Sequence, residues 1–70
     1  FEMSEAIRLL LLKFQSSGHL KENLDIDVET SRLHALVDGL GIHSLLQPDK
    51  LTIKGMLDVL KSHLETIIQA

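Results

Sequence analysis

Two glycines lie within a strongly apolar stretch of this sequence, "RLHALVDGLGIHSLLQP", which runs from Arg32 to Pro48. Inside a helix each glycine costs about 0.8–1 kcal/mol relative to alanine, so Gly39 and Gly41 need a physical reason. One reason is that the helix breaks there, as it does in a helix-turn-helix. The other is that a neighbouring backbone approaches so closely that no side chain fits. The first alternative favours DNA recognition and the second favours helix packing.

The residues that follow Gly39 argue against a DNA-reading helix. The recognition helix would be "GIHSLLQP", which contains no lysine or arginine and is interrupted by Pro48. A helix that reads the major groove needs polar and basic side chains for phosphates and base edges. We therefore predict one continuous helix through both glycines.

Such a continuous helix has two apolar faces, and each face follows helical spacing. One face consists of Leu33, Leu36, Val37 and Leu40, and the other consists of Ala35, Gly39, Ile42 and Leu46. A helix that is apolar on two sides lies between two neighbours. We therefore expect Gly39 at a close helix crossing.

The remaining sequence also has helical periodicity, and no stretch alternates as a half-buried strand does. Gly18 is placed to end the first helix, and Pro48 closes the second. Asp27 and Thr52 are predicted to cap the starts of the second and third helices. The sequence thus predicts one all-α domain over residues 1–70. Its helices are expected at about residues 3–17, 28–46 and 53–69.

Composition limits the function classes. The net charge is −3 and basic residues occur singly, so we expect no nucleic acid to bind this stretch. No apolar run approaches the ~20 residues that span a bilayer, so no membrane association is expected. The absence of cysteine suits a cytoplasmic protein. The chain is small and 44% hydrophobic, so a second copy or further sequence is expected to cover part of its aliphatic surface.

The four histidines do not form a convincing metal or catalytic site. His34 and Asp38 lie one turn apart, but His43 points to nearly the opposite side of that helix and His63 lies on another. A metal needs three or four converging ligands. We therefore predict no metal, no cofactor and no enzymatic activity, and interpret His34 and Asp38 as a partly buried polar pair.

Taken together, "SGHLKENLDIDVETSRLHALVDGLGIHSLLQPDKLT" and the following "MLDVLKSHL" resemble the C-terminal end of a TetR-family transcriptional regulator. One departure is Gly55, where related sequences often have an acidic residue that would support the start of the last helix. The features that carry the resemblance are Gly18, Leu20, Asp27, Leu33 to Leu40, His43, Leu45, Leu46, Pro48, Leu51 and Thr52.

The resemblance implies that this is a repressor fragment without the N-terminal DNA-binding domain and most of the effector pocket. It also implies a homodimer in which the last two helices of each copy form an intermolecular four-helix bundle. The candidate contacts are Ala35, Gly39, Ile42, His43, Leu46, Leu57, Leu60, Leu64 and Ile67. The face of the third helix that meets the partner stays open at this point.

The first helix corresponds to one that walls the cavity for a small apolar effector in this family. The candidate lining residues are Ile7, Leu10, Leu11 and Phe14, although packing in the core is the commoner role of such a stripe. The alternative function is a free-standing helical module that binds another protein.

Overall fold

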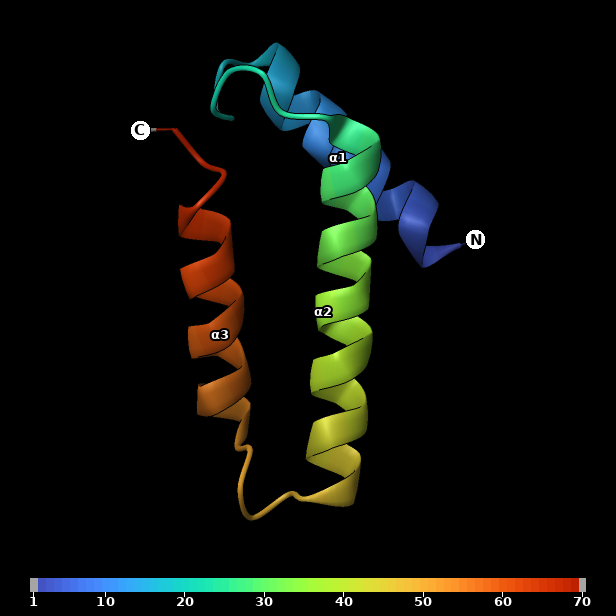
Figure 1. Cartoon of the computed structure of the whole chain (residues 1–70), viewed down its shortest axis with the longest axis vertical. Helices are drawn as coiled ribbons and strands as arrows, with labels where there is room; N and C mark the ends of the chain where they lie inside the picture. Colours follow the sequence, from blue (N-terminus) through green and yellow to red (C-terminus); the bar gives the residue numbers. More distant parts are fainter. Residues whose placement is uncertain (1, 70) are drawn as a thin grey trace.

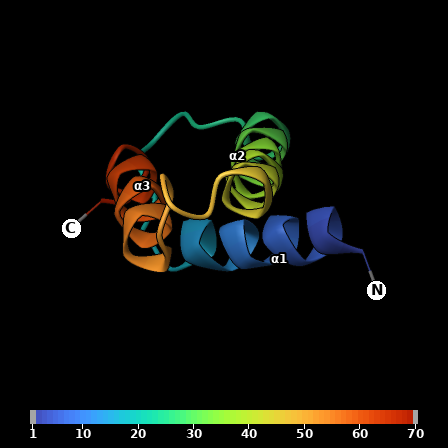
Figure 2. The same ribbon diagram turned by 90° about the horizontal axis from the view of Figure 1, so that it is seen from below.

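The computed structural model describes residues 2–69 and confirms the all-α prediction. The three helices are α1 (Met3–Ser16), α2 (Ile26–Leu46) and α3 (Ile53–Glu65). The helices α2 and α3 run side by side and antiparallel, and α1 crosses one end of the pair (Figure 1). Figure 2 shows α1 on a single side of the α2–α3 pair, so no helix within residues 2–69 covers the opposite side of the pair.

The end of α1 follows the glycine-dependent motif that the sequence predicts. Gly18 has a φ of +77°, the left-handed conformation that other residues rarely adopt. Its N–H donates to the carbonyl of Gln15 at 3.1 Å, and the N–H of His19 donates to the carbonyl of Phe14 at 2.9 Å. These two bonds satisfy carbonyls that the helix leaves free at its end.

The second helix begins two residues earlier than predicted. Asp25, rather than Asp27, has the extended backbone of a capping residue, and its carboxylate accepts from the N–H groups of Asp27 and Val28 at 3.0 and 3.3 Å. The helix then continues without interruption through Gly39 and Gly41. The helix-turn-helix alternative is therefore excluded for this stretch.

The third helix starts as predicted but ends earlier. The hydroxyl of Thr52 accepts from the N–H of Gly55 at 3.0 Å, which confirms the cap. After Glu65 the chain leaves the helix and pairs with the loop between α1 and α2. The N–H of Lys21 donates to the carbonyl of Ile67 at 2.9 Å, and the N–H of Gln69 donates to the carbonyl of His19 at 2.7 Å.

The core lies at the end of the molecule where α1, this loop and the C-terminal segment meet. Its buried members are Leu11, Leu20 and Ile67. Partly buried aliphatic and aromatic side chains surround them: Ile7, Phe14, Leu24, Ile26 and Leu64. By contrast α3, which is described over its whole length, contains no buried residue.

Candidate functional site

The exposed side of α2 is the first candidate interaction surface. Burial separates the two predicted faces, because Leu33 is buried while Ile42 and Leu46 are 60% and 74% exposed. Leu36, Val37 and Leu40 are half-buried on the inner side. We call the exposed side the outer face. It consists of Val28, Ala35, Gly39, Ile42 and Leu46.

Within residues 2–69, no side chain and no other segment of the backbone comes close to Gly39. A Cβ built at this glycine would meet no atom within 4 Å, and the same holds at Gly41. The close helix crossing expected at Gly39 is therefore not made within one copy of the chain. The reason is that α1 and α3 both pack against other sides of α2 (Figure 2).

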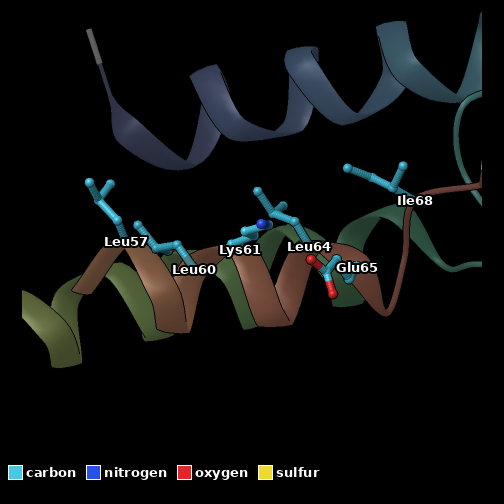
Figure 3. A pocket seen from close by; sticks show the side chains of 6 residues that line it. All are labelled: Leu57, Leu60, Lys61, Leu64, Glu65 and Ile68. Carbon is cyan, nitrogen blue, oxygen red and sulfur yellow. The ribbon is translucent and has the colours of Figure 1, made fainter. Parts of the chain in front are cut away.

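The second candidate surface is a groove on α3 with a volume of about 730 Å³. Leu57, Leu60 and Leu64 rise from α3 toward the side on which α1 lies (Figure 3). We call this the leucine groove, and its remaining lining residues are Lys61, Glu65 and Ile68. The groove opens on the α1 side, whereas the outer face of α2 points away from α1. The α2 and α3 candidates for the dimer contact therefore lie on opposite sides of the helical pair.

Other candidate residues have their own positions in the fold. Ile67 is 2% exposed and belongs to the core, so it is not available on a surface of this chain. His43 is exposed and its Nε2 lies 3.0 Å from Oε1 of Gln47.

Of the proposed effector-pocket residues, Leu11 is a core residue, while Ile7 and Phe14 pack against that core. Leu10 is 48% exposed. The leucine groove is lined by α3 and the segment that follows it, and by none of these four α1 residues.

Polar contacts hold α1 against α2. On α2 itself, the predicted pair of His34 and Asp38 is present, and Nε2 of His34 lies 3.4 Å from Oδ2 of Asp38. The other ring nitrogen of His34 bonds to the hydroxyl of Ser4 on α1, a partner that sequence spacing could not reveal. Nε of Arg8 donates to Asp27 at 3.2 Å. No group of three metal-ligating side chains is found among residues 2–69.

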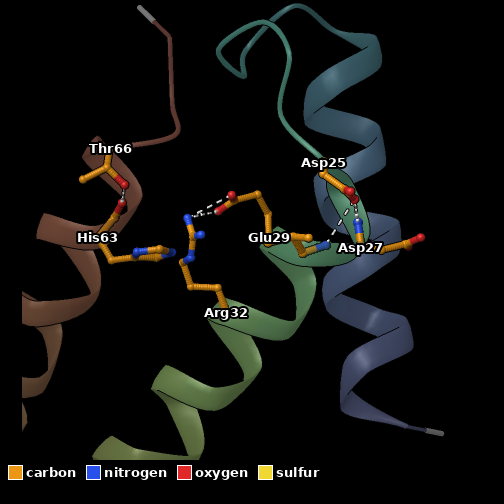
Figure 4. Close-up of polar contacts among 7 residues, drawn as sticks. Asp25, Asp27, Glu29, Arg32, His63 and Thr66 are labelled. Atoms are coloured by element: carbon orange, nitrogen blue, oxygen red, sulfur yellow. Dashed lines mark hydrogen bonds and ion pairs between the residues drawn. The ribbon is translucent and has the colours of Figure 1, made fainter.

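An ion pair on α2, in which Glu29 is buried and the Arg32 side chain is 56% exposed, faces α3 (Figure 4). The Glu29 carboxylate is 5% exposed and accepts two bonds from Nη1 of Arg32, at 3.0 and 3.2 Å. The His63 ring extends from α3 toward this pair (Figure 4), and its Nε2 is buried without a hydrogen-bond partner. Sequence reasoning missed this cluster, because Glu29 is a usual first-turn acidic residue and nothing in its spacing indicates burial.

A comparison with models of known protein families shows the family of this chain. Residues 2–69 match the model for the C-terminal domain of BetI-type transcriptional repressors. The chain belongs to the TetR family of transcriptional regulators. TetR-family proteins of this kind are regulators rather than enzymes, in agreement with the sequence prediction.

A curated TetR-type relative gives the same result. The chain is 39% identical over 61 residues to the HTH-type transcriptional regulator PksA of Bacillus subtilis (strain 168). The match covers 87% of this chain but 30% of PksA. No solved structure matches the chain significantly. None of the helices in residues 2–69 is long and apolar enough to cross a membrane.

Proposed function

We propose that this chain is the C-terminal part of a TetR-type transcriptional repressor that pairs with a second copy and contributes to a cavity for a small apolar effector. In the whole protein, DNA binding falls to the helix-turn-helix part that the name of PksA mentions. Such a repressor acts in the cytoplasm. The observation that carries the proposal is the exposed apolar outer face of α2, in a chain of this family.

The total exposed area supports association. The chain exposes 5133 Å². A compact monomer of its mass would expose only about 4400 Å². The excess, roughly 700 Å², is close to the ~800 Å² that each partner contributes to a standard protein interface. This excess includes both the outer face of α2 and the leucine groove of α3.

The leucine groove supports the effector part of the proposal. Its volume of about 730 Å³ lies within the range of roughly 300–1,000 Å³ that is usual for ligand pockets. Its walls are mainly aliphatic. Lys61 adds a positive charge to the lining and Glu65 adds a negative charge. A small, largely apolar molecule fits this chemistry, and no cofactor is required.

Sedimentation of the 70-residue chain at micromolar concentration tests the pairing. We expect a dimer that becomes a monomer in Ile42→Glu, because the glutamate would bury an unpaired charge in the interface. Leu45→Glu is the matched control, since Leu45 is 80% exposed but lies off the outer face. Circular dichroism verifies that both variants remain helical. A folded monomer in the unmutated chain would overturn the proposal.

DNA binding is tested with the same chain and duplex DNA at moderate salt. We expect no specific complex, because the net charge of −3 gives little attraction for phosphates. A salt-sensitive and sequence-selective shift in a gel assay would contradict this part of the proposal.

A further inference from the structure

We propose that the C-terminal segment, residues 66–69, couples the leucine groove to the end of α1. A ligand in the groove holds this segment closed on the loop between α1 and α2, and the closed segment in turn completes the groove. This inference rests on the proposed effector role of the leucine groove, and adds the part of the fold that responds to the effector.

The first step is that two neighbouring residues of the segment belong to different regions. Ile67 is 2% exposed and packs in the core with Leu11 of α1. Ile68, the next residue, is 39% exposed and lines the leucine groove. It stands at one end of the row of α3 leucines (Figure 3). The core and the groove therefore share one short stretch of backbone.

The second step is the attachment of the segment to α3. Leu64 lines the groove and also packs against the core. Its carbonyl accepts from the N–H groups of Ile67 and Ile68, at 3.0 and 2.9 Å. A rigid peptide bond joins these two isoleucines, so a displacement of Ile68 in the groove also displaces Ile67 in the core.

The third step is that backbone hydrogen bonds continue from the segment to α1. The N–H of Lys21 donates to the carbonyl of Ile67 at 2.9 Å, and the N–H of Gln69 donates to the carbonyl of His19 at 2.7 Å. The N–H of His19 donates in turn to the carbonyl of Phe14, in the last turn of α1. The groove wall is therefore connected to the end of α1 without a gap.

The fourth step is that the segment can open separately from the helices. Among residues 66–69, Ile67 alone is buried. Segments with few buried contacts open locally at a lower free energy than the rest of a fold. Opening removes Ile68 from the groove wall, so a ligand that contacts Ile68 binds the closed form better. By linkage, such a ligand stabilises the closed form.

Amide hydrogen exchange of the 70-residue chain, followed by NMR, tests the coupling with octanol as a neutral aliphatic probe. The methyl signals of Leu57 and Leu60 report whether octanol occupies the groove. The N–H groups of Lys21 and Gln69 are the reporter amides. With octanol at about ten times its Kd, their exchange should slow by up to about tenfold. The N–H of Gln47, at the other end of α2, should change by less than about twofold.

A matched pair of isoleucine variants separates binding from coupling. Ile68→Ala shortens the groove wall but leaves Ile67 in the core. Octanol should still shift the leucine methyl signals, with a Kd that is weaker by roughly threefold or more. At equal saturation, however, the reporter amides should stay within about twofold of their rates without ligand. Ile53→Ala makes the same change outside the groove, at a side chain that is 74% exposed, and should keep both responses.

A proline variant examines the coupling in the reverse direction. Gln69→Pro removes the N–H that donates to His19, and position 69 does not line the groove. The looser segment should weaken octanol binding by roughly threefold or more in Kd. Gln69→Ala keeps the backbone N–H and should leave Kd within about twofold. The NMR titration measures both constants and verifies that both variants remain folded.

The outcomes separate this inference from the function on which it rests. If octanol does not shift the leucine methyl signals, both the effector role of the groove and the coupling are overturned. If the signals shift but the reporter amides do not slow, or Gln47 slows equally, the coupling alone is overturned. Full slowing in Ile68→Ala, or unchanged binding in Gln69→Pro, would also overturn the coupling and leave the effector site in place.

Discussion

Both ends of this molecule carry large aliphatic side chains, but these side chains are buried at one end and exposed at the other. At the closed end, Leu11, Leu20 and Ile67 are at most 5% exposed. At the open end, near the turn between α2 and α3, Leu45, Leu46 and Ile53 are at least 74% exposed. The closed end is covered by the chain itself, whereas no other segment of residues 2–69 covers these side chains at the open end.

The number of segments that meet at each end explains the difference. At the closed end α1, the loop after it and the C-terminal segment join the helical pair (Figure 1). Among residues 2–69, the open end contains α2, α3 and their short connection. Two helices can cover one stripe of each other, but they cannot surround a core. Hydrophobicity alone therefore does not determine where a core forms in a chain this small.

The largest expected effect comes from removing a core side chain at the closed end. Ile67→Ala should lower the free energy of unfolding by about 2–5 kcal/mol, because it leaves a cavity beside Leu11 and Leu20. Ile53→Ala is the same change at the open end, where the side chain is 74% exposed, and should cost less than about 0.5 kcal/mol. Urea unfolding at a concentration that keeps the chain monomeric compares them. Equal losses would show that the two ends do not differ in packing.

Two of the ion pairs, Glu29–Arg32 on α2 and Lys54–Asp58 on α3, give a smaller contrast. Arg32→Met leaves the buried carboxylate of Glu29 without its partner, and should lower stability by about 1–3 kcal/mol. Lys54→Met breaks a pair whose members, Lys54 and Asp58, are both exposed. That loss should stay below about 0.5 kcal/mol, because water screens exposed charges. Thermal unfolding measures both, and a Lys54 effect as large as that of Arg32 would contradict the assigned burial.

The smallest effects should differ in sign at two glycines. Gly18→Ala should destabilise the chain by about 1 kcal/mol, because it forces a Cβ into the left-handed conformation that ends α1. Gly41→Ala should instead stabilise it by about 0.5–1 kcal/mol, since α2 is helical there and the added methyl meets no atom. Calorimetry on monomeric samples measures both shifts. A stabilising Gly18→Ala would contradict the role of this glycine at the closed end.

Local features of the fold could be predicted from local sequence. The spacing of Leu33 and Ile42 assigned them to opposite faces of one helix, and burial agrees. Gly18 and Thr52 acted at helix ends as expected, since both effects depend on the nearest backbone groups. The predicted start of α2 was two residues too late, because Asp25 and Asp27 are both residues that can cap a helix and the sequence does not show which one does.

Features that depend on distant segments could not be predicted. Ile67 continues the spacing of α3, but its backbone pairs with Lys21, and no periodicity reports a bond between such distant residues. Leu60 and Gly39 were assigned to one interface although they lie on opposite sides of the helical pair. Periodicity identifies the apolar side of each helix, but not how one helix is rotated relative to another.

The pairing of the C-terminal segment with the loop after α1 also determines when the chain can fold. Leu11 lies on α1 and Ile67 follows α3, so the contact between them closes a long loop. During synthesis α1 and α2 can form and meet early, but the core stays incomplete until Ile67 has left the ribosome.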